Sequence, residues 1–166
     1  MSDPAPSGTV VIGVGNPLMG DDGLGLAALA VLQNEWMFDP PVTLLDGGTW
    51  GMNLLPQIEE AERLLLLDAV KGGQPPGTVV ELVGDAIPRL FATKLSPHQI
   101  DLREVLALAE WRGTLPGRTV ALGVQPEQVE LGTELSAPVA QAIPALVARA
   151  IAVLREWGHR AEPRPA

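Results

Sequence analysis

The feature that most constrains the fold is a continuous apolar run near the start of the chain, Thr9–Gly15, with the sequence TVVIGVG. A strand with one face in water alternates polar and apolar residues, but this run has no polar residue after its first position. We therefore predict a strand buried on both faces, as in the centre of a parallel sheet covered by helices. The segment 21–36 follows with leucine and alanine at helical spacing, which predicts the first crossover helix.

The rest of the chain repeats this alternation of strand and helix. Further strands are predicted at 42–46, 63–70, 78–83 and 118–124, and further helices at 49–60, 97–112 and 138–158. The pattern predicts an α/β fold: a three-layer α/β/α sandwich around a twisted, mostly parallel five-stranded sheet, in a single domain over residues 1–166.

Two details of the predicted fold follow from the loops and the ends. The turn at 72–77 is too short for a crossover helix, so the strand at 78–83 is expected to run antiparallel to the strand at 63–70. The proline-rich ends, 1–7 and 160–166, are expected to be flexible. His159 lies next to the second of these ends, past the predicted core, so the substitution His159→Ala is expected to be silent.

Composition excludes several classes of protein. The chain carries 11 Lys and Arg against 20 Asp and Glu, a net charge of −9, which makes it a poor ligand for nucleic acid or an anionic membrane. It has no cysteine, which excludes disulfides, thiolate nucleophiles and cysteine-ligated metals. It has two histidines, so no site can use three. No leader sequence is visible, and no apolar run approaches the ~20 residues of a membrane span. We expect a soluble cytoplasmic protein, whose oligomeric state the sequence does not indicate.

The glycines after the first strand suggest a nucleotide-binding loop, but the pattern fails. The dinucleotide-binding pattern requires a glycine at position 18, which is Leu18. The phosphate-binding loop pattern matches at Gly15 and Gly20, but Asp21 and Asp22 replace its lysine and hydroxyl residue. Two carboxylates would repel a phosphate, which disfavours a nucleotide-binding oxidoreductase. Carboxylates are favourable at a helix N-terminus, and we interpret Asp21 as a helix cap.

Three side chains with metal-binding chemistry fall where ligand sites form in α/β sheets. Asp22 follows the first strand, and Asp68 ends the third, apolar strand, where a carboxylate is costly unless it has a partner. These two strands are commonly neighbours, and ligands bind beyond the carboxyl ends of the strands. With His98, which precedes a predicted helix, they form a plausible ligand set for a divalent transition metal. Each residue alone has a simpler explanation: a helix cap, a strand-end turn and a surface histidine.

A second loop at the end of a strand has the sequence Asp46-Gly47-Gly48-Thr49. Two consecutive glycines allow unusual backbone angles and the close approach of another chain. The alternative is an ordinary turn, in which Thr49 caps the next helix and Asp46 accepts hydrogen bonds from the loop amides.

Familiar hydrolase signatures are missing from the chain. There is neither an H-E-x-x-H helix nor a G-x-S-x-G turn. Ser96 lies two residues before His98, but no third group is indicated that would orient the histidine, which makes a serine hydrolase a weak hypothesis.

Four segments, taken in order, resemble the hydrogenase maturation endopeptidases. They are Gly13–Gly23, Asp46–Thr49, Leu67–Ala69 and Lys94–Gln99, within a resemblance that covers residues 9–158. Members of this family remove the C-terminal extension from the large-subunit precursor of nickel–iron hydrogenases. The resemblance implies an endopeptidase with that precursor as its partner, and a five-stranded sheet between helices.

The resemblance also implies roles for individual residues. Asp22, Asp68 and His98 fall on the three metal-contacting positions of the family, the first of which is a glutamate in many members. They are expected to take part in catalysis by sensing nickel that the precursor supplies. The loop from Asp46 falls on a segment for substrate recognition or cleavage, so Asp46 is expected to assist the chemistry, and substrate recognition is expected from Gly47, Gly48 and Thr49. A non-catalytic nickel-binding chaperone with the same three ligands remains the alternative.

Overall fold

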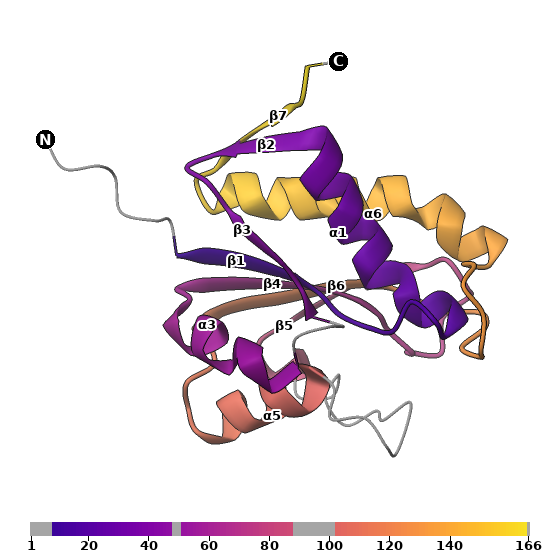
Figure 1. The fold of residues 1–166 in the computed structure, drawn as a ribbon, viewed down its shortest axis with the longest axis horizontal. Helices are drawn as coiled ribbons and strands as arrows, with labels where there is room; N and C mark the ends of the chain where they lie inside the picture. The colour runs from indigo at the N-terminus through magenta and orange to yellow at the C-terminus, as the bar shows by residue number, and fades with distance from the viewer. Residues whose placement is uncertain (1–7, 48–50, 88–101, 166) are drawn as a thin grey trace, which may run out of the picture.

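The computed structural model describes residues 8–47, 51–87 and 102–165, which form a sheet with helices on both faces (Figure 1). The elements are, in chain order, β1 (Thr9–Gly13), η1 (Gly20–Gly23), α1 (Leu24–Glu35), β2 (Trp36–Asp39), β3 (Thr43–Asp46), η2 (Gly51–Leu54), α3 (Leu55–Glu60), β4 (Arg63–Ala69), β5 (Val79–Val83), η3 (Gly84–Ala86), α5 (Leu102–Trp111), β6 (Arg118–Val124), α6 (Ala137–Glu156) and β7 (Arg160–Pro163). The predicted three-layer α/β/α architecture is confirmed.

The strands of the main sheet run in the order β3-β1-β4-β6-β5. The first four are parallel, and β1 pairs with β4, as expected for the first and third strands of the prediction. The strand β5 is antiparallel, as predicted, but it pairs with β6 at the edge of the sheet and not with β4. The strand β6 therefore lies between β4 and β5, and the short turn after β4 passes across the end of β6.

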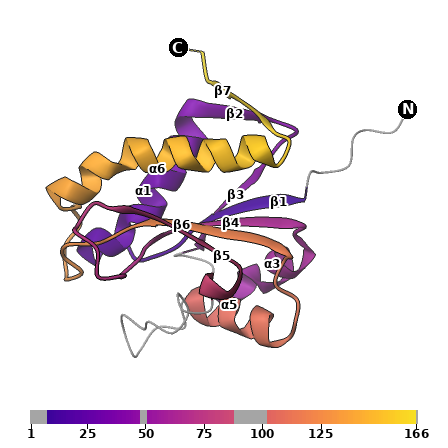
Figure 2. The same cartoon turned by 180° about the vertical axis from the view of Figure 1, so that it is seen from behind.

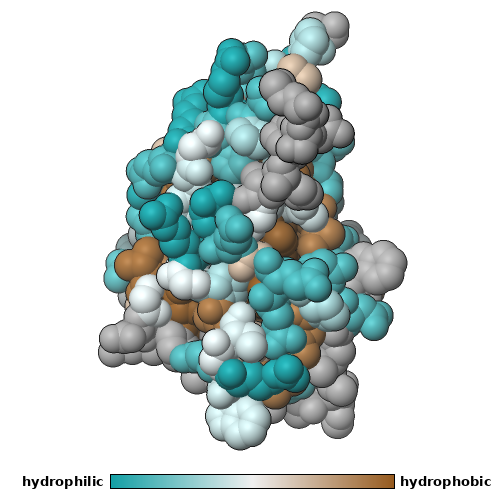
Figure 3. Space-filling model, turned by 90° about the vertical axis from the view of Figure 1, so that its left-hand side faces the viewer, coloured by the Kyte–Doolittle hydropathy of each residue, from teal (hydrophilic) through white to brown (hydrophobic). Residues whose placement is uncertain are grey.

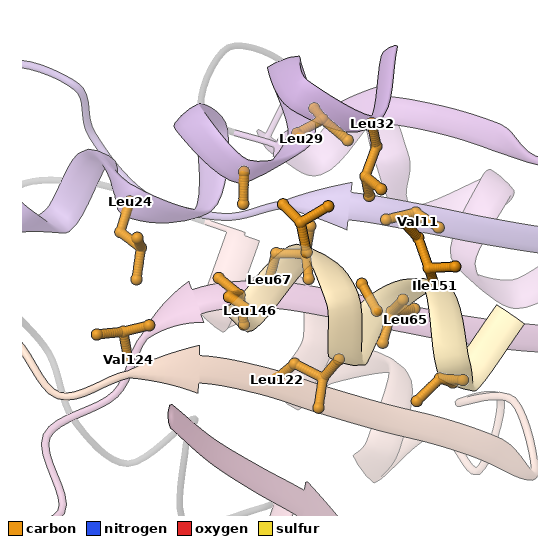
Figure 4. Packing of buried hydrophobic residues seen from close by; sticks show 14 of the residues in the cluster. Val11, Leu24, Leu29, Leu32, Leu65, Leu67, Leu122, Val124, Leu146 and Ile151 are labelled. Carbon is orange, nitrogen blue, oxygen red and sulfur yellow. The ribbon is translucent and has the colours of Figure 1, made fainter. Parts of the chain in front are cut away.

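Two apolar layers hold the helices to the sheet. Alternate residues of each strand enter different layers: Leu65 and Leu67 of β4 pack with α1 and α6, whereas Leu64 and Leu66 pack with α3 and α5. Figure 4 shows the first layer, where Leu146 and Ile151 of α6 meet the side chains of β4 and β6. The apolar runs noted in the sequence are thus strands buried on both faces.

The helix α6 contains a proline and is long and apolar. Pro144 lies on the exposed side of the helix, which continues through it to Glu156. Among the described residues α6 is the one helix long and apolar enough to cross a membrane, and 44% of its most apolar window is buried in the fold. A core helix of a soluble domain has these properties too, since its buried face must be apolar.

The predicted flexible C-terminal end is wrong for residues 160–163. These residues form β7, which pairs antiparallel with β2 in a separate two-stranded ribbon (Figure 2). The same pairing corrects the predicted end of the first helix, because Trp36 begins β2 and does not continue α1. Figure 3 views the molecule from the side where β1 enters the sheet, and hydrophilic side chains cover much of it with hydrophobic patches between them.

His159 is part of the core, which corrects the expectation that it lies past it. Its side chain is buried, with Nδ1 2.7 Å from the carbonyl oxygen of Pro40 and Nε2 2.9 Å from Oγ1 of Thr9. A carbonyl oxygen can only accept, so Nδ1 carries the proton and Nε2 accepts from the Thr9 hydroxyl. The Thr9 oxygen in turn accepts a hydrogen bond from Nε of Arg63. This chain of bonds joins the C-terminal segment to β1 and β4.

We now expect His159→Ala to be destabilising. The substitution leaves the Pro40 carbonyl and the Thr9 hydroxyl without their histidine partner, and it opens a cavity, which together cost about 2–3 kcal/mol of unfolding free energy. Urea unfolding measures the change. Arg160→Ala is the matched control, because its ion pair with Glu162 is exposed and such pairs contribute little. Equal unfolding free energies for the two variants would contradict the structural role of His159.

Candidate active site

Three parallel strands end at one edge of the sheet and bring two of the predicted site residues there. Asp46 ends β3 opposite Gly13 of β1, and Gly13 in turn lies opposite Leu67 of β4, one residue before Asp68. Adjacent strands lie about 4.8 Å apart, so the backbones of Asp46 and Asp68 are about 10 Å apart across the sheet. Asp68 is completely buried, and Asp46 is partly buried.

Strand alternation separates the side chains of these two aspartates. Asp68 has the parity of Leu66, which packs in the layer of α3 and α5. Asp46 has the parity of Leu44, which packs in the layer of α1 and α6. The sheet therefore directs the two carboxylates toward opposite faces at the same edge, which favours separate roles for them.

Asp22 reaches this edge through the turn that follows β1. It lies in η1, which packs against β4, and its side chain is only 4% exposed. Its carboxylate accepts a hydrogen bond from the backbone N–H of Asn16, at 2.9 Å. A side chain at Gly15 is impossible here, since its Cβ would overlap the backbone oxygen of Asp22 and its φ is +124°. The glycines that resemble a nucleotide-binding loop thus serve to fold the turn closely around Asp22.

Asp21 has a different role from the helix cap that the sequence suggested. Neither η1 nor α1 has a side-chain cap, and the Asp21 carboxylate is buried. It accepts hydrogen bonds from the backbone N–H groups of Glu127, Gln128 and Ser136 at 2.7–2.9 Å, and from the Ser136 hydroxyl at 2.8 Å. Asp21 therefore fastens the segment 127–136, which connects β6 to α6, onto the turn that carries Asp22.

These hydrogen bonds also set the ionisation of Asp21. Burial alone raises its pKa, but the bonds from Gln128, Ser136 and Glu127 outweigh that effect and lower the pKa below the ordinary value of 3.8. A carboxyl group whose pKa is lower in the folded state contributes stability above its ordinary pKa and loses it as the pH falls through the lowered value.

We expect Asp21→Asn to lower the free energy of unfolding at neutral pH by about 3 kcal/mol, because an amide nitrogen must face at least one of the N–H donors. The loss of stability below the ordinary pKa should also be shallower in this variant than in the wild type. Urea unfolding between about pH 2.5 and 7, a range that spans the titration of a carboxyl group, measures both effects. Asp39→Asn, at an exposed position, is the control. A variant as stable as the wild type would contradict the anchoring role.

Part of the predicted site lies outside the described residues. His98 and two residues of the glycine loop, Gly48 and Thr49, belong to segments that the structure does not describe, whereas Gly47 is described and buried. Within residues 8–47, 51–87 and 102–165, no group of three or more His, Asp or Glu side chains could hold a metal ion. The structure thus brings Asp22, Asp46 and Asp68 to one edge and leaves the position of His98 open.

Sequence reasoning missed Asp21 and its partner Ser136 as structural residues of this site. More than a hundred residues separate them along the chain, so no local pattern links them. The one local indication was a second carboxylate next to Asp22, which the sequence analysis explained as a helix cap.

Comparisons with known proteins identify the family of this chain. The family model HycI, described as hydrogenase maturation protease, matches residues 28–153. The hydrogenase expression/formation protein HoxM of Cupriavidus necator is 40% identical over 159 residues, covering 95% of this chain and 79% of that protein. The hydrogenase 2 maturation protease of Escherichia coli is 35% identical over 158 residues, covering 95% of this chain and 96% of that protein.

Solved structures give the same result. The hydrogenase maturating endopeptidase HybD from Escherichia coli superposes with a TM-score of 0.84 at 35% identity, covering 94% of this chain and 97% of that one. The hydrogenase 3 maturation protease superposes with a TM-score of 0.63 at 26% identity, covering 85% and 87%. With its family model, its relatives and its fold in agreement, this chain belongs to the hydrogenase maturation proteases, a family of endopeptidases.

Proposed function

We propose that this protein removes the C-terminal extension from the large-subunit precursor of a nickel–iron hydrogenase, after nickel has been inserted into the precursor. In this proposal Asp22, Asp68 and His98 contact the nickel, which belongs to the substrate and is not a resident cofactor. Asp46 assists the chemistry, and the loop of Gly47, Gly48 and Thr49 contacts the scissile segment.

The observation that carries the proposal is the pair of buried carboxylates at the carboxyl edge of β1 and β4. Asp68 is fully buried and Asp22 nearly so, and both lie where adjacent parallel strands end. Carboxylate and imidazole side chains are ligands of divalent transition metals. Ligand sites of open α/β sheets form at this edge.

The proposal takes its third ligand, His98, from the segment of the chain that precedes α5. The helix α5 begins at Leu102, covers the face of the sheet toward which Asp68 is directed, and contacts η2 next to the end of β3.

The residues suit a nickel ion that another protein already holds. Nickel is a borderline metal, and two carboxylates and an imidazole bind it only weakly when they are its only protein ligands. In the proposal the other protein holds the same ion through softer ligands. Contact with the nickel would place the scissile segment next to the carboxylates at the edge. A water activated by a carboxylate or by the substrate's own metal would then attack the peptide carbonyl.

The direct test is to mix the purified protein with a nickel-loaded large-subunit precursor and to follow the precursor by mass spectrometry. The proposal predicts a single cut that releases the C-terminal extension. A precursor of unchanged mass that gains or loses nickel would instead support the non-catalytic chaperone.

A further inference from the structure

Two exposed leucines lie on paired backbone segments next to the candidate site. Leu18 is 57% exposed and Leu131 is 85% exposed, although both are large and apolar. A parallel bridge pairs the following residues, Met19 and Gly132, and the N–H of Gly132 donates to the carbonyl of Leu18 at 2.9 Å. Leu18 and Leu131 each precede one of the two bridged residues, so the bridge brings the backbones that carry them close together. We refer to Leu18 and Leu131 as the leucine pair.

The backbone beneath the leucine pair is firmly held. Gly20 donates to the Gly132 carbonyl at 2.9 Å, and Asp21 donates to the Gln128 carbonyl at 2.8 Å. Gly20 has a φ of +57°, and a Cβ there would lie 2.9 Å from the Gln128 oxygen, so only glycine allows this close approach. The buried carboxylate of Asp21 adds the four hydrogen bonds described above. The leucine pair thus stands on a platform made by two segments far apart in the chain. The second segment, drawn in orange before α6, passes beside the start of α1 in Figure 1.

The platform is continuous with the candidate site. Leu18 is in the same turn as Asn16, whose backbone N–H binds the carboxylate of Asp22, and the N–H of Asp22 donates to the carbonyl of Met19. A molecule seated on the leucine pair would therefore be adjacent to the turn that holds Asp22. Exposed acidic side chains flank the pair along the second segment, at Glu127, Glu130 and Glu134.

We propose that the leucine pair is a docking surface for the substrate, and that it receives an apolar side chain of the precursor flanked by basic residues. This inference rests on the proposed function and names the part of the site that recognises the protein substrate. Apolar contact supplies affinity, and the surrounding carboxylates select a cationic segment and accelerate its association.

The negative charge of this surface favours a basic segment of the precursor over other binding partners. A second copy of this chain, with a net charge of −9, would bring its own carboxylates against Glu127, Glu130 and Glu134. Juxtaposed like charges disfavour such a contact, and an anionic lipid surface is disfavoured for the same reason. A basic segment of another protein is the partner that satisfies both the apolar and the acidic parts of the surface.

The test compares the double variant Leu18→Ser, Leu131→Ser with the control Trp111→Ser. Trp111 is also 85% exposed, but it ends α5 and lies at the opposite edge of the sheet from the carboxyl ends of the strands. The substrate is the nickel-loaded precursor, and both its binding and its processing are measured. We expect the double variant to raise KM about tenfold with kcat within about twofold of the wild type, as for the truncation of a binding hot spot. Trp111→Ser should leave KM unchanged, and all unfolding midpoints should match the wild type.

The outcomes separate the docking surface from the proteolytic activity. A double variant with the KM of the wild type overturns the docking surface and leaves the proposed function standing. Binding by the wild type that is lost in the double variant, with no cleavage by either, supports the docking surface and refutes the proteolysis. The triple variant Glu127→Gln, Glu130→Gln, Glu134→Gln should bind more weakly at low salt and with a smaller dependence on salt. An unchanged salt dependence overturns the assignment of a basic segment.

Discussion

Asp22→Ala and Asp68→Ala are each expected to reduce processing of a nickel-loaded precursor by at least about a hundredfold, the scale on which losing a metal contact acts. Both side chains are buried at the carboxyl edge of adjacent strands, so water cannot easily substitute for either carboxylate. The initial rate of release of the C-terminal extension, followed by mass spectrometry, measures the effect. His98→Ala should have an effect of similar size.

Conservative variants distinguish a metal contact from a structural role. Asp22→Glu keeps the carboxylate and lengthens the side chain by one methylene, and it is expected to retain much of the activity. Asp68→Asn keeps the size of the side chain but removes its charge, and it should be as inactive as Asp68→Ala. Glu110→Ala, on the exposed side of α5, is the control for loss of a carboxylate. Circular dichroism should remain near that of the wild type in each case, and normal processing by His98→Ala would refute the metal hypothesis.

The strands of the main sheet could be predicted because the residue pattern that indicates each strand lies within the strand itself. The runs that became β1 and β4 are apolar at almost every position, which is expected only for strands buried on both faces. Their adjacency also follows from the general architecture of parallel sheets. The pairing of β5 with β6 could not be predicted, since the turn after β4 indicates the direction of the next strand but not its neighbour.

The β2–β7 ribbon was missed because its pairing is non-local. Trp36 continues the apolar spacing of α1, and Arg160–Pro163 lies in a polar, proline-containing tail, so neither segment indicates a strand by itself. Each is a strand only in the presence of the other. The structural role of His159 was missed for the same reason, because its partners Pro40 and Thr9 lie more than a hundred residues away.

For the candidate site, the sequence could predict the position of two carboxylates but not of the residue that anchors them. Asp22 and Asp68 could be selected because a carboxylate after a buried strand has a recognisable position, and the structure places both at one edge. Asp21 could not, since its function depends on hydrogen bonds from the distant segment 127–136. In the proposed docking of the substrate this has a further consequence, because the residue beside Asp22 anchors the segment that carries Leu131.

Precursor that lacks nickel is expected to remain uncut, and cleavage should begin once nickel is in place. In the proposed function the metal is the link between the two proteins, because Asp22, Asp68 and His98 contact an ion that the precursor holds. Without that contact the docking surface alone must position the scissile segment, and misplacement of a reacting group by about 1 Å can reduce a rate a hundredfold. Interaction with the metal would thus supply the orientation that cutting one bond in one partner requires.

The experiment uses precursor made in cells starved of nickel, which is mixed with this protein and followed before and after nickel is restored. The isolated protein should bind added nickel only loosely, since its proposed ligands include no thiolate, and calorimetry of the free protein measures this. The leucine-pair variant gives the comparison: it should slow cleavage of the nickel-loaded form through KM, whereas absence of nickel should abolish turnover. Efficient cleavage of the metal-free precursor would refute nickel sensing. Asp22 and Asp68 would then have an ordinary hydrolytic or structural role.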